Sequence, residues 1–269
     1  MSDEIEAIER AALQDLHDSA TEALRAALGL DCRPSGTGLV SLASALPASA
    51  IVANRTIGLG LAAPETRSAV AEAIERYRAA GIGRFFVHLH PEARPAQLVD
   101  WLGELGLEAT RGWMKFSRGR AAPPRAETAL DLRPARTEDA EAFGRIVTDA
   151  FDLGPAAAPW VAGLIGRSGW HVYVSEADGH LAGTGSLFVR DGVGWIDWGA
   201  TAPAFRGRGS QSALLHRRIT DALDMGCRKI VTTTGEAVAG DPQHSYNNIV
   251  RMGFEPAYLR RNFAPPKPA

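Results

Sequence analysis

An internal repeat constrains the fold of this chain more than any other feature of the sequence. Gly106-Leu107-Glu108, followed by Phe116, matches Gly253-Phe254-Glu255, followed by Phe263, with ten residues from glycine to phenylalanine in both copies. Self-similarity on this scale indicates a duplicated structural unit. Two related domains are therefore expected.

The chain length and a linker-like segment agree with two domains. At 269 residues the chain is longer than the roughly 250 residues at which single cores stop growing. Residues 119–129 contain two adjacent prolines and no apolar periodicity, which is typical of a linker. We expect one domain in residues 1–118 and a second in residues 130–269.

Hydrophobic periodicity and turn residues predict the elements of both halves. Helices are expected over residues 2–29, 64–80, 95–105, 137–151, 155–165, 209–225 and 245–252. Strands are expected over residues 39–42, 51–61, 84–89, 113–117, 130–134, 171–176, 181–190, 194–200, 229–234 and 257–263. Asp-Gly turns at 178–179 and 191–192 favour an antiparallel meander. The pattern predicts an α/β fold with a mixed sheet.

Composition argues against several classes of partner. The net charge is −2 and neither half is basic, which disfavours a nucleic-acid partner. No apolar run of 18 residues occurs, so no membrane partner is expected. Cys32 and Cys227 lie far apart, which predicts free thiols and no metal site. The acidic first ten residues differ from a signal peptide, so a cytoplasmic protein is expected.

A glycine-rich turn in the second half predicts an anion site. The segment Arg206-Gly207-Arg208-Gly209-Ser210-Gln211 joins a strand to a helix. The start of a helix offers unpaired N–H groups and the positive end of its dipole, and the glycines allow close approach of phosphate oxygens. An exposed basic turn is the alternative. No P-loop motif occurs, and Ser212 replaces the third glycine of the dinucleotide fingerprint.

The first half offers no comparable turn. The step from Pro64 to Gly81 is six residues shorter than the matching step from Pro203 to Gly226. The six additional residues coincide with the glycine-rich turn, where the first half has only Glu65-Thr66-Arg67-Ser68. We therefore predict that the first copy is degenerate and lacks a phosphate loop.

The glycine-rich turn resembles the acyl-CoA signature of the GNAT superfamily, [QR]-x-x-G-x-[GA]. Arg206 and Gly209 match this signature, whereas Gln211 stands where a small residue is usual. The resemblance covers about residues 130–263, and the first half resembles the same fold without the signature. It implies two tandem GNAT-like acyl-CoA N-acyltransferase domains, with acetyl-CoA as cosubstrate and no metal.

The family resemblance also implies where the acyl donor binds. Pantetheine would pair with the strand that precedes the turn, and main-chain N–H groups of that strand would polarise the thioester carbonyl. The expected CoA-binding residues are Trp198, Gly199, Ala200, Thr201, Arg206, Gly207, Arg208, Gly209, Ser210, Gln211 and Asn248. Helix capping is the alternative role for Asn248.

Direct attack by a primary amine requires a base, because amines are mostly protonated at neutral pH. Asp197 and Glu236 are the nearest acidic residues, and strand alternation would place Asp197 and Trp198 on opposite faces. The family usually has a tyrosine acid where this sequence has Ile249. Tyr246, one helical turn earlier, either serves as this acid or packs against the sheet. The catalytic candidates are therefore Asp197, Glu236 and Tyr246.

The acceptor is a small-molecule amine or a peptide amine. Four tryptophans either line its pocket or belong to the core, namely Trp160, Trp170, Trp195 and Trp198. The first half either completes the pocket or provides an interface for a homodimer. A non-catalytic acyl-CoA-binding module, a pseudoenzyme, is the alternative function, because Ile249 and Gln211 depart from the family pattern.

Overall fold

A computed structural model of the protein describes residues 2–267, without the side chains of residues 2 and 3. Both halves of the chain contain helices and strands. The first half contains α1 (Ser2–Asp18), α2 (Glu22–Leu28), β1 (Leu30–Ser35), β2 (Gly38–Ala43), β3 (Arg55–Ile57), α3 (Arg67–Ala79), β4 (Phe86–Leu89), α4 (Leu98–Glu104) and β5 (Glu108–Arg118). The second contains β6 (Asp131–Pro134), α5 (Ala140–Ala150), α6 (Ala158–Ala162), β7 (Trp170–Ala177), β8 (His180–Arg190), β9 (Val193–Thr201), α7 (Ser210–Asp224), β10 (Lys229–Gly235), α8 (His244–Arg251) and β11 (Glu255–Ala264). Short 3-10 helices precede α5, α6 and α7.

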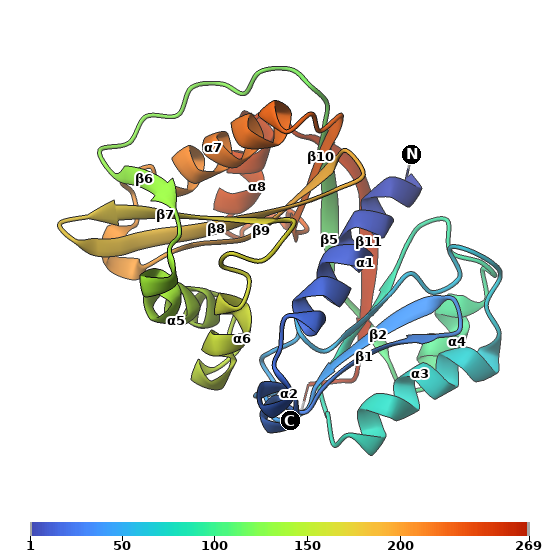
Figure 1. The fold of residues 1–269 in the computed structure, drawn as a ribbon. Helices are drawn as coiled ribbons and strands as arrows, with labels where there is room; N and C mark the ends of the chain where they lie inside the picture. The colour runs from blue at the N-terminus through green and yellow to red at the C-terminus, as the bar shows by residue number, and fades with distance from the viewer. Residues whose placement is uncertain (1, 268–269) are drawn as a thin grey trace.

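One mixed sheet runs through both halves (Figure 1). Its eleven described strands lie in the order β1-β2-β3-β4-β11-β5-β10-β9-β8-β7-β6. β3 pairs with β4 and β9 with β10 in parallel, and the remaining pairs are antiparallel. The predicted α/β fold with a mixed sheet is confirmed, as is the antiparallel meander β7-β8-β9.

The last strand of each half lies beside a strand of the other half. β5 ends the first half and pairs with β10, whereas β11 ends the second half and pairs with β4. β5 and β11 also pair with each other at the centre of the sheet. The two halves therefore share a continuous network of backbone hydrogen bonds.

Equivalent glycines end equivalent helices in the two halves. Gly81 follows α3 and Gly226 follows α7, with φ of 72° and 82°. Gly106 follows α4 and Gly253 follows α8, with φ of 82° and 79°. Glycine adopts this left-handed conformation without a Cβ penalty, which explains its use where a helix must stop before a strand. The landmarks of the sequence repeat are thus the same structural feature in both copies.

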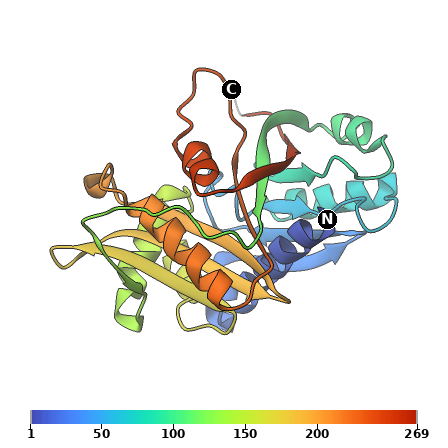
Figure 2. The ribbon, with the colours of Figure 1, turned by 90° about the horizontal axis from the view of Figure 1, so that it is seen from above.

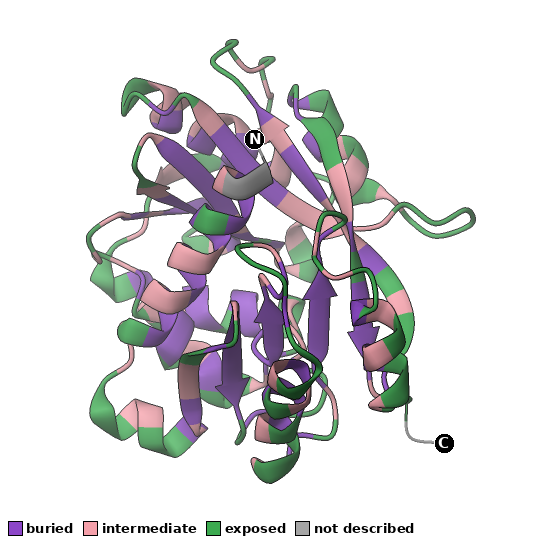
Figure 3. Cartoon of the chain, turned by 90° about the vertical axis from the view of Figure 1, so that its right-hand side faces the viewer, coloured by how far each residue is buried: buried purple, intermediate pink, exposed green. Residues whose placement is uncertain are grey.

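Helices cover both faces of the sheet, and strand alternation divides the core between them. On β2, Leu39 packs with Leu13 of α1, whereas Val40 packs among residues of α3 and α4. On β9, Trp195 packs with residues of α1, α5 and α6, whereas Ile196 packs with residues of α7 and α8. The strands are accordingly buried and the outer helix surfaces exposed (Figure 3). No helix of the described chain is long and apolar enough to cross a membrane.

Two predicted elements of the first half were wrong. The expected helix over residues 2–29 is two helices, because the chain turns at Ser19 and Ala20 and Thr21 caps α2 by accepting the N–H of Leu24 at 3.2 Å. The sequence also predicts that the Ser2 side chain caps the first helix, but this side chain is not among those that the structure describes. The expected strand over residues 51–61 reduces to β3, since turns occupy residues 51–53.

The predicted six-residue deletion does not fall in the loop that precedes α3. This loop, residues 58–66, has nine residues, and the corresponding loop before α7, residues 202–209, has eight. Pro64 lies three residues before its helix, whereas Pro203 lies seven residues before its helix, so the two prolines are not equivalent. The prediction was wrong because the two prolines occupy different positions in their loops, so the distance from each proline to the next glycine does not measure the length of the loop.

Candidate active site

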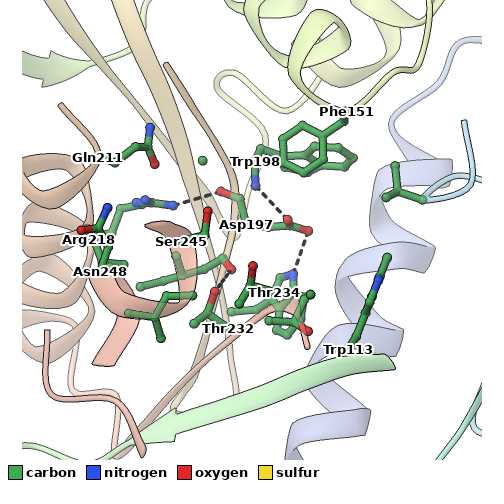
Figure 4. Close-up of a pocket in the computed structure, with 18 of the residues that line it drawn as sticks. Trp113, Phe151, Asp197, Trp198, Gln211, Arg218, Thr232, Thr234, Ser245 and Asn248 are labelled. Atoms are coloured by element: carbon green, nitrogen blue, oxygen red, sulfur yellow. Dashed lines mark hydrogen bonds between the residues drawn. The ribbon is translucent and has the colours of Figure 1, made fainter. Parts of the chain in front are cut away.

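A pocket opens where β9 and β10 separate. The two strands pair only through residues 193–195 and 229–231, and beyond these β9 pairs with β8 and β10 with β5. The gap forms a cavity of about 320 Å³, here called the central pocket, between the ends of β9 and β10, α7 and α8 (Figure 4). The Thr232 hydroxyl donates to the Ile196 carbonyl at 3.0 Å and closes its narrow end.

A β-bulge shapes the β9 wall of this pocket. Thr184 pairs with Ala200 and Ser186 with Asp197, so Gly185 alone faces two residues, and Trp198 has a φ of 50°. The extra residue interrupts strand alternation. The prediction that Asp197 and Trp198 face opposite sides was therefore wrong, because the Asp197 carboxylate bonds to Trp195 and the Trp198 ring belongs to the same core cluster as Trp195.

Asp197 presents the carboxylate of the central pocket. Its oxygens accept the backbone N–H of Trp198 at 2.8 Å and the Nε1–H of Trp195 at 3.1 Å. Burial raises the pKa of the Asp197 carboxyl above its usual value, and the Trp198 N–H bond opposes this effect. A carboxylate with a raised pKa is a better proton acceptor at neutral pH than an ordinary aspartate.

Side chains of α7 donate hydrogen bonds to the bulged backbone of β9. Buried Arg218 donates from Nη1 to the Asp197 carbonyl at 3.0 Å, and burial lowers its pKa to about 10. Gln211 donates from Nε2 to the Ala200 carbonyl at 2.6 Å and to the Thr201 hydroxyl at 3.1 Å. The residue that departs from the family signature thus fixes the end of β9.

The N-terminus of α7 offers a set of free backbone donors. No backbone N–H from residue 207 to 212 donates a hydrogen bond to another described residue. Gly207 and Gly209 have φ of 79° and 80°, and a Cβ on Gly207 would meet nothing within 4 Å. Arg206 and Arg208 are exposed beside these donors. Free N–H groups, a helix dipole and two guanidinium groups make a site that suits a diphosphate.

The segment between the halves passes beside this loop, as seen from above in Figure 2. The Thr128 hydroxyl donates to the Arg208 carbonyl at 2.7 Å. A Cβ on Gly209 would lie 2.6 Å from the Glu127 carbonyl oxygen, so a larger residue there would displace this segment. Gly207 is therefore the better position for testing the loop alone.

The expected site residues fall into three places, of which one is a hollow lined by Thr201 and Arg206 together with Arg133 and Asp139. Asp197, Trp198, Gly199, Gln211 and Asn248 all line the central pocket. Glu236 and Tyr246 line a separate hollow, here called the flanking hollow, which shares Thr234, Gly235 and Ser245 with the central pocket.

Both residues of the flanking hollow make structural contacts. Glu236 accepts the Gly112 N–H at 3.0 Å, and Tyr246 packs edge-on against Phe116 with ring centroids 4.9 Å apart. The structure therefore does not bring Glu236 and Tyr246 to the carboxylate of Asp197.

The four tryptophans also divide between pocket and core. Trp195 and Trp198 line the central pocket, where the Trp198 ring lies 5.1 Å from that of Phe151. Trp160 donates to the Leu16 carbonyl at 2.9 Å and Trp170 to Asp15 at 2.8 Å, both on the α1 side of the sheet.

The central pocket also contains residues that the sequence did not predict, among them Arg55, Trp113 and Arg218. Two of them carried a detectable signal. Arg55 is a charge inside an apolar run, and Arg218 lies on the apolar stripe of α7, four residues after Leu214. A charged residue at a core position must find a partner, so each is a candidate for a functional contact. Trp113 had no such signal, because β5 reaches the pocket only through pairing with β10.

One family model matches the part of the chain that contains most of these residues. The model of the acetyltransferase (GNAT) family matches residues 140–254, which include the bulged strand, the loop and α8. No curated protein matches the chain. In the described residues, no cluster of three or more His, Cys, Asp or Glu side chains could hold a metal ion.

Solved structures with the same fold span both halves. A GCN5-related N-acetyltransferase from Kribbella flavida is 18% identical, with a TM-score of 0.61 over 94% of this chain and 95% of that one. A GCN5-related N-acetyltransferase from Sphaerobacter thermophilus is also 18% identical, with a TM-score of 0.61 over 90% and 84%. A tandem GNAT protein from the clavulanic acid biosynthesis pathway is 18% identical, with a TM-score of 0.52 over 74% and 68%. These similarities show that the chain as a whole shares the fold of these structures.

Proposed function

We propose that the protein is an N-acetyltransferase, because the model of the acetyltransferase (GNAT) family matches residues 140–254. It transfers an acetyl group from acetyl-CoA to the primary amine of an acceptor by direct attack. The observation that carries this proposal is the central pocket, which extends from Gln211 in the first turn of α7 to Asp197.

Acetyl-CoA fits the second half as the acyl donor. We propose that the pyrophosphate binds the free N–H groups of residues 207–212, with Arg206 and Arg208 as counter-charges. Pantetheine lies along residues 198–201 of β9, which have no strand partner on the pocket side among the described residues, and beside Asn248. The thioester supplies an activated carbonyl carbon, and main-chain donors stabilise the developing oxyanion.

Asp197 is the proposed base. It removes a proton from the acceptor ammonium, and the free amine attacks the thioester carbonyl. The departing thiolate needs little help, because a thiol pKa near 8.5 makes it a tolerable leaving group. Tyr246, in the flanking hollow, is the proposed proton donor to the thiolate, and Glu236 of the same hollow is the alternative base.

The two halves have different proposed roles. Residues 1–118 form a degenerate copy without CoA chemistry, residues 119–129 a linker, and residues 130–269 the catalytic copy. The first half completes the acceptor end of the central pocket through Arg55 and Trp113. We place the protein in the cytoplasm, with an amine acceptor and neither nucleic acid nor membrane as partner.

A non-catalytic acyl-CoA sensor is the second candidate. Ile249 is buried where the family usually carries its tyrosine acid, and this observation favours binding without chemistry. Release of free thiol from acetyl-CoA, measured against a panel of amines, separates the two functions. An enzyme accelerates thiol release with at least one amine, and Asp197→Asn removes that acceleration while acetyl-CoA still binds. Binding without acceleration by any amine would instead establish the sensor.

A further inference from the structure

The central pocket continues past Asp197 to a buried arginine from the first half. Arg55 on β3 is 7% exposed and lines the pocket together with Trp113 on β5. Figure 4 shows Gln211 and Asn248 on one side of Asp197 and Trp113 on the other. Since the loop before α7 lies on the Gln211 side, Arg55 belongs to the acceptor end.

Arg55 has donors that the protein leaves unpaired. Its Nη1 donates to Oε1 of Glu9 at 3.0 Å, and its guanidinium carbon lies 5.5 Å from the centre of the Trp113 ring. Its buried Nε has no hydrogen-bond partner among the described residues. A guanidinium group carries five N–H donors, and leaving them unpaired in the interior is unfavourable. A ligand that accepts hydrogen bonds would complete this group.

Glu9 does not neutralise Arg55 alone. Its carboxylate also binds Lys115 at 2.6 Å and Arg260 at 2.6 Å, and Arg260 binds Glu6 at 3.1 Å. Three basic side chains therefore share Glu6 and Glu9, and the Asp197 carboxylate lies close enough for the charge of Arg55 to lower its pKa. Burial is the largest cause that lowers the pKa of Lys115, to about 8. Arg55 thus shares its one bonded carboxylate with two other cations, which leaves its guanidinium group able to bind an anion in the pocket.

We propose that the acceptor is a small aminocarboxylate, an amino acid-like molecule whose carboxylate binds Arg55 while its amine faces Asp197. The proposal rests on the acyl transfer proposed above. A planar carboxylate matches the paired donors of a guanidinium group. The aromatic rings of Trp113, Phe151 and Trp198 line the same pocket and suit the carbon skeleton and an approaching ammonium.

The direct test compares acceptors that differ only in the anion. Wild-type protein is assayed with a series of aminocarboxylates, with the matching amines that lack the carboxylate, and with matching amines that carry a phosphate instead. We expect kcat/KM to favour the carboxylate by on the order of 100-fold, because the uncharged partner leaves Arg55 unpaired. Equal rates for carboxylate and plain amine, or preference for the phosphate, would overturn the proposal.

Variants separate recognition from folding. Arg55→Gln should reduce the carboxylate-to-amine ratio to near one, and Arg55→Lys should leave an intermediate ratio. Lys115→Met is the matched control, because Lys115 binds Glu9 but does not line the pocket. A loss of folding in this control lowers both rates and leaves their ratio unchanged. An unchanged ratio in Arg55→Gln would contradict the proposal.

Equilibrium binding tests the anion site at Arg55 separately from the proposed acetyltransferase activity. Calorimetry with an aminocarboxylate in the presence of CoA should show binding to wild type and at least tenfold weaker binding to Arg55→Gln. If no amine is acetylated but this difference persists, the enzyme assignment fails while Arg55 remains the anion site. If amines are acetylated but the difference is absent, the Arg55 proposal fails alone.

Discussion

Helices α7 and α3 hold equivalent places in the two halves, yet their N-termini differ in what meets them. At α7 the free backbone donors face outward beside Arg206 and Arg208. At α3 the chain supplies its own anion, Glu65. Its Oε1 accepts the Thr66 N–H at 3.1 Å, and its Oε2 accepts the Thr37 N–H and hydroxyl, each at 2.7 Å.

This difference supports our proposal that the second copy, and not the first, binds an external phosphate. A carboxylate at a helix N-terminus satisfies the dipole and the free N–H groups in the way that a phosphate would. Glu65 is only 7% exposed, so an external anion would have to displace a buried charge. The two loops are similar in length, and the first copy is thus closed by one side chain rather than by a deletion.

The two pairs of parallel strands also differ in what lies beside them, which is packed side chains in the first half and an open pocket in the second. Between β3 and β4, Tyr77 is fully buried, stacks on Phe85 at 4.1 Å and bonds to the Thr56 hydroxyl at 2.9 Å. The gap between β9 and β10 instead remains open as the central pocket. Side chains occupy in the first half the space that we assign to pantetheine in the second.

The largest expected effect is on the open helix. The double change Arg206→Glu with Arg208→Glu should weaken acetyl-CoA binding by about 100- to 10,000-fold, because charge-assisted bonds contribute about 1.5–3 kcal/mol each. Calorimetry measures the affinity. Arg67→Glu at the start of α3 is the control, since Arg67 is exposed and we expect no change in affinity. A loss below threefold in the double variant would remove the loop from the site.

The next effect concerns Asp197, the base that we propose in the second half. Asp197→Asn should lower kcat/KM by about 100- to 10,000-fold without changing acetyl-CoA affinity. Burial raises the Asp197 pKa, and the base works only when ionised, so wild-type activity should fall as pH drops through that raised pKa. The pH–rate profile of the variant should lack this limb. Exposed Asp100→Asn on α4 serves as control, and an unchanged rate for Asp197→Asn would exclude the base.

A smaller effect should follow from opening the closed helix. Glu65→Gln removes a charged acceptor from three donors, and we expect the free energy of unfolding to fall by about 1–3 kcal/mol. Urea denaturation measures it, with acetyl-CoA affinity unchanged. Glu104→Gln, which breaks an exposed ion pair with Arg67, should cost less than about 1 kcal/mol. Equal costs for the two variants would contradict the role of Glu65.

The smallest effect is expected from the flanking hollow. Tyr246→Phe keeps the ring contact with Phe116 and removes only the hydroxyl. Because the thiolate leaves without much assistance, kcat should fall by less than about tenfold. A fall of 100-fold with unchanged affinity for acetyl-CoA would instead make Tyr246 an essential acid.

Local patterns in the sequence predicted much of this architecture. Glycine after a periodic helix marks Gly226 and Gly253, and Asp-Gly turns joined the meander strands, because these conformations depend on a few neighbouring residues. The loop before α7 was predicted for the same reason, since its glycines and arginines are contiguous.

Features that depend on distant segments were not predicted. The bulge at Trp198 depends on how β9 pairs with β8, and the approach of Arg55 and Trp113 depends on the exchanged strands β5 and β11. The hydrogen bonds of Glu65 were not predicted, because the donors on Thr37 lie 28 residues away in the sequence. Pairing at such distance leaves no local pattern to read.

The number of acetyl-CoA molecules bound per chain tests the central claim most directly. Titration calorimetry of the full-length protein should give one site per chain, and the double change Arg206→Glu with Arg208→Glu should remove that site. A second site, or one site that persists in the double variant, would contradict the assignment of donor binding to the second half.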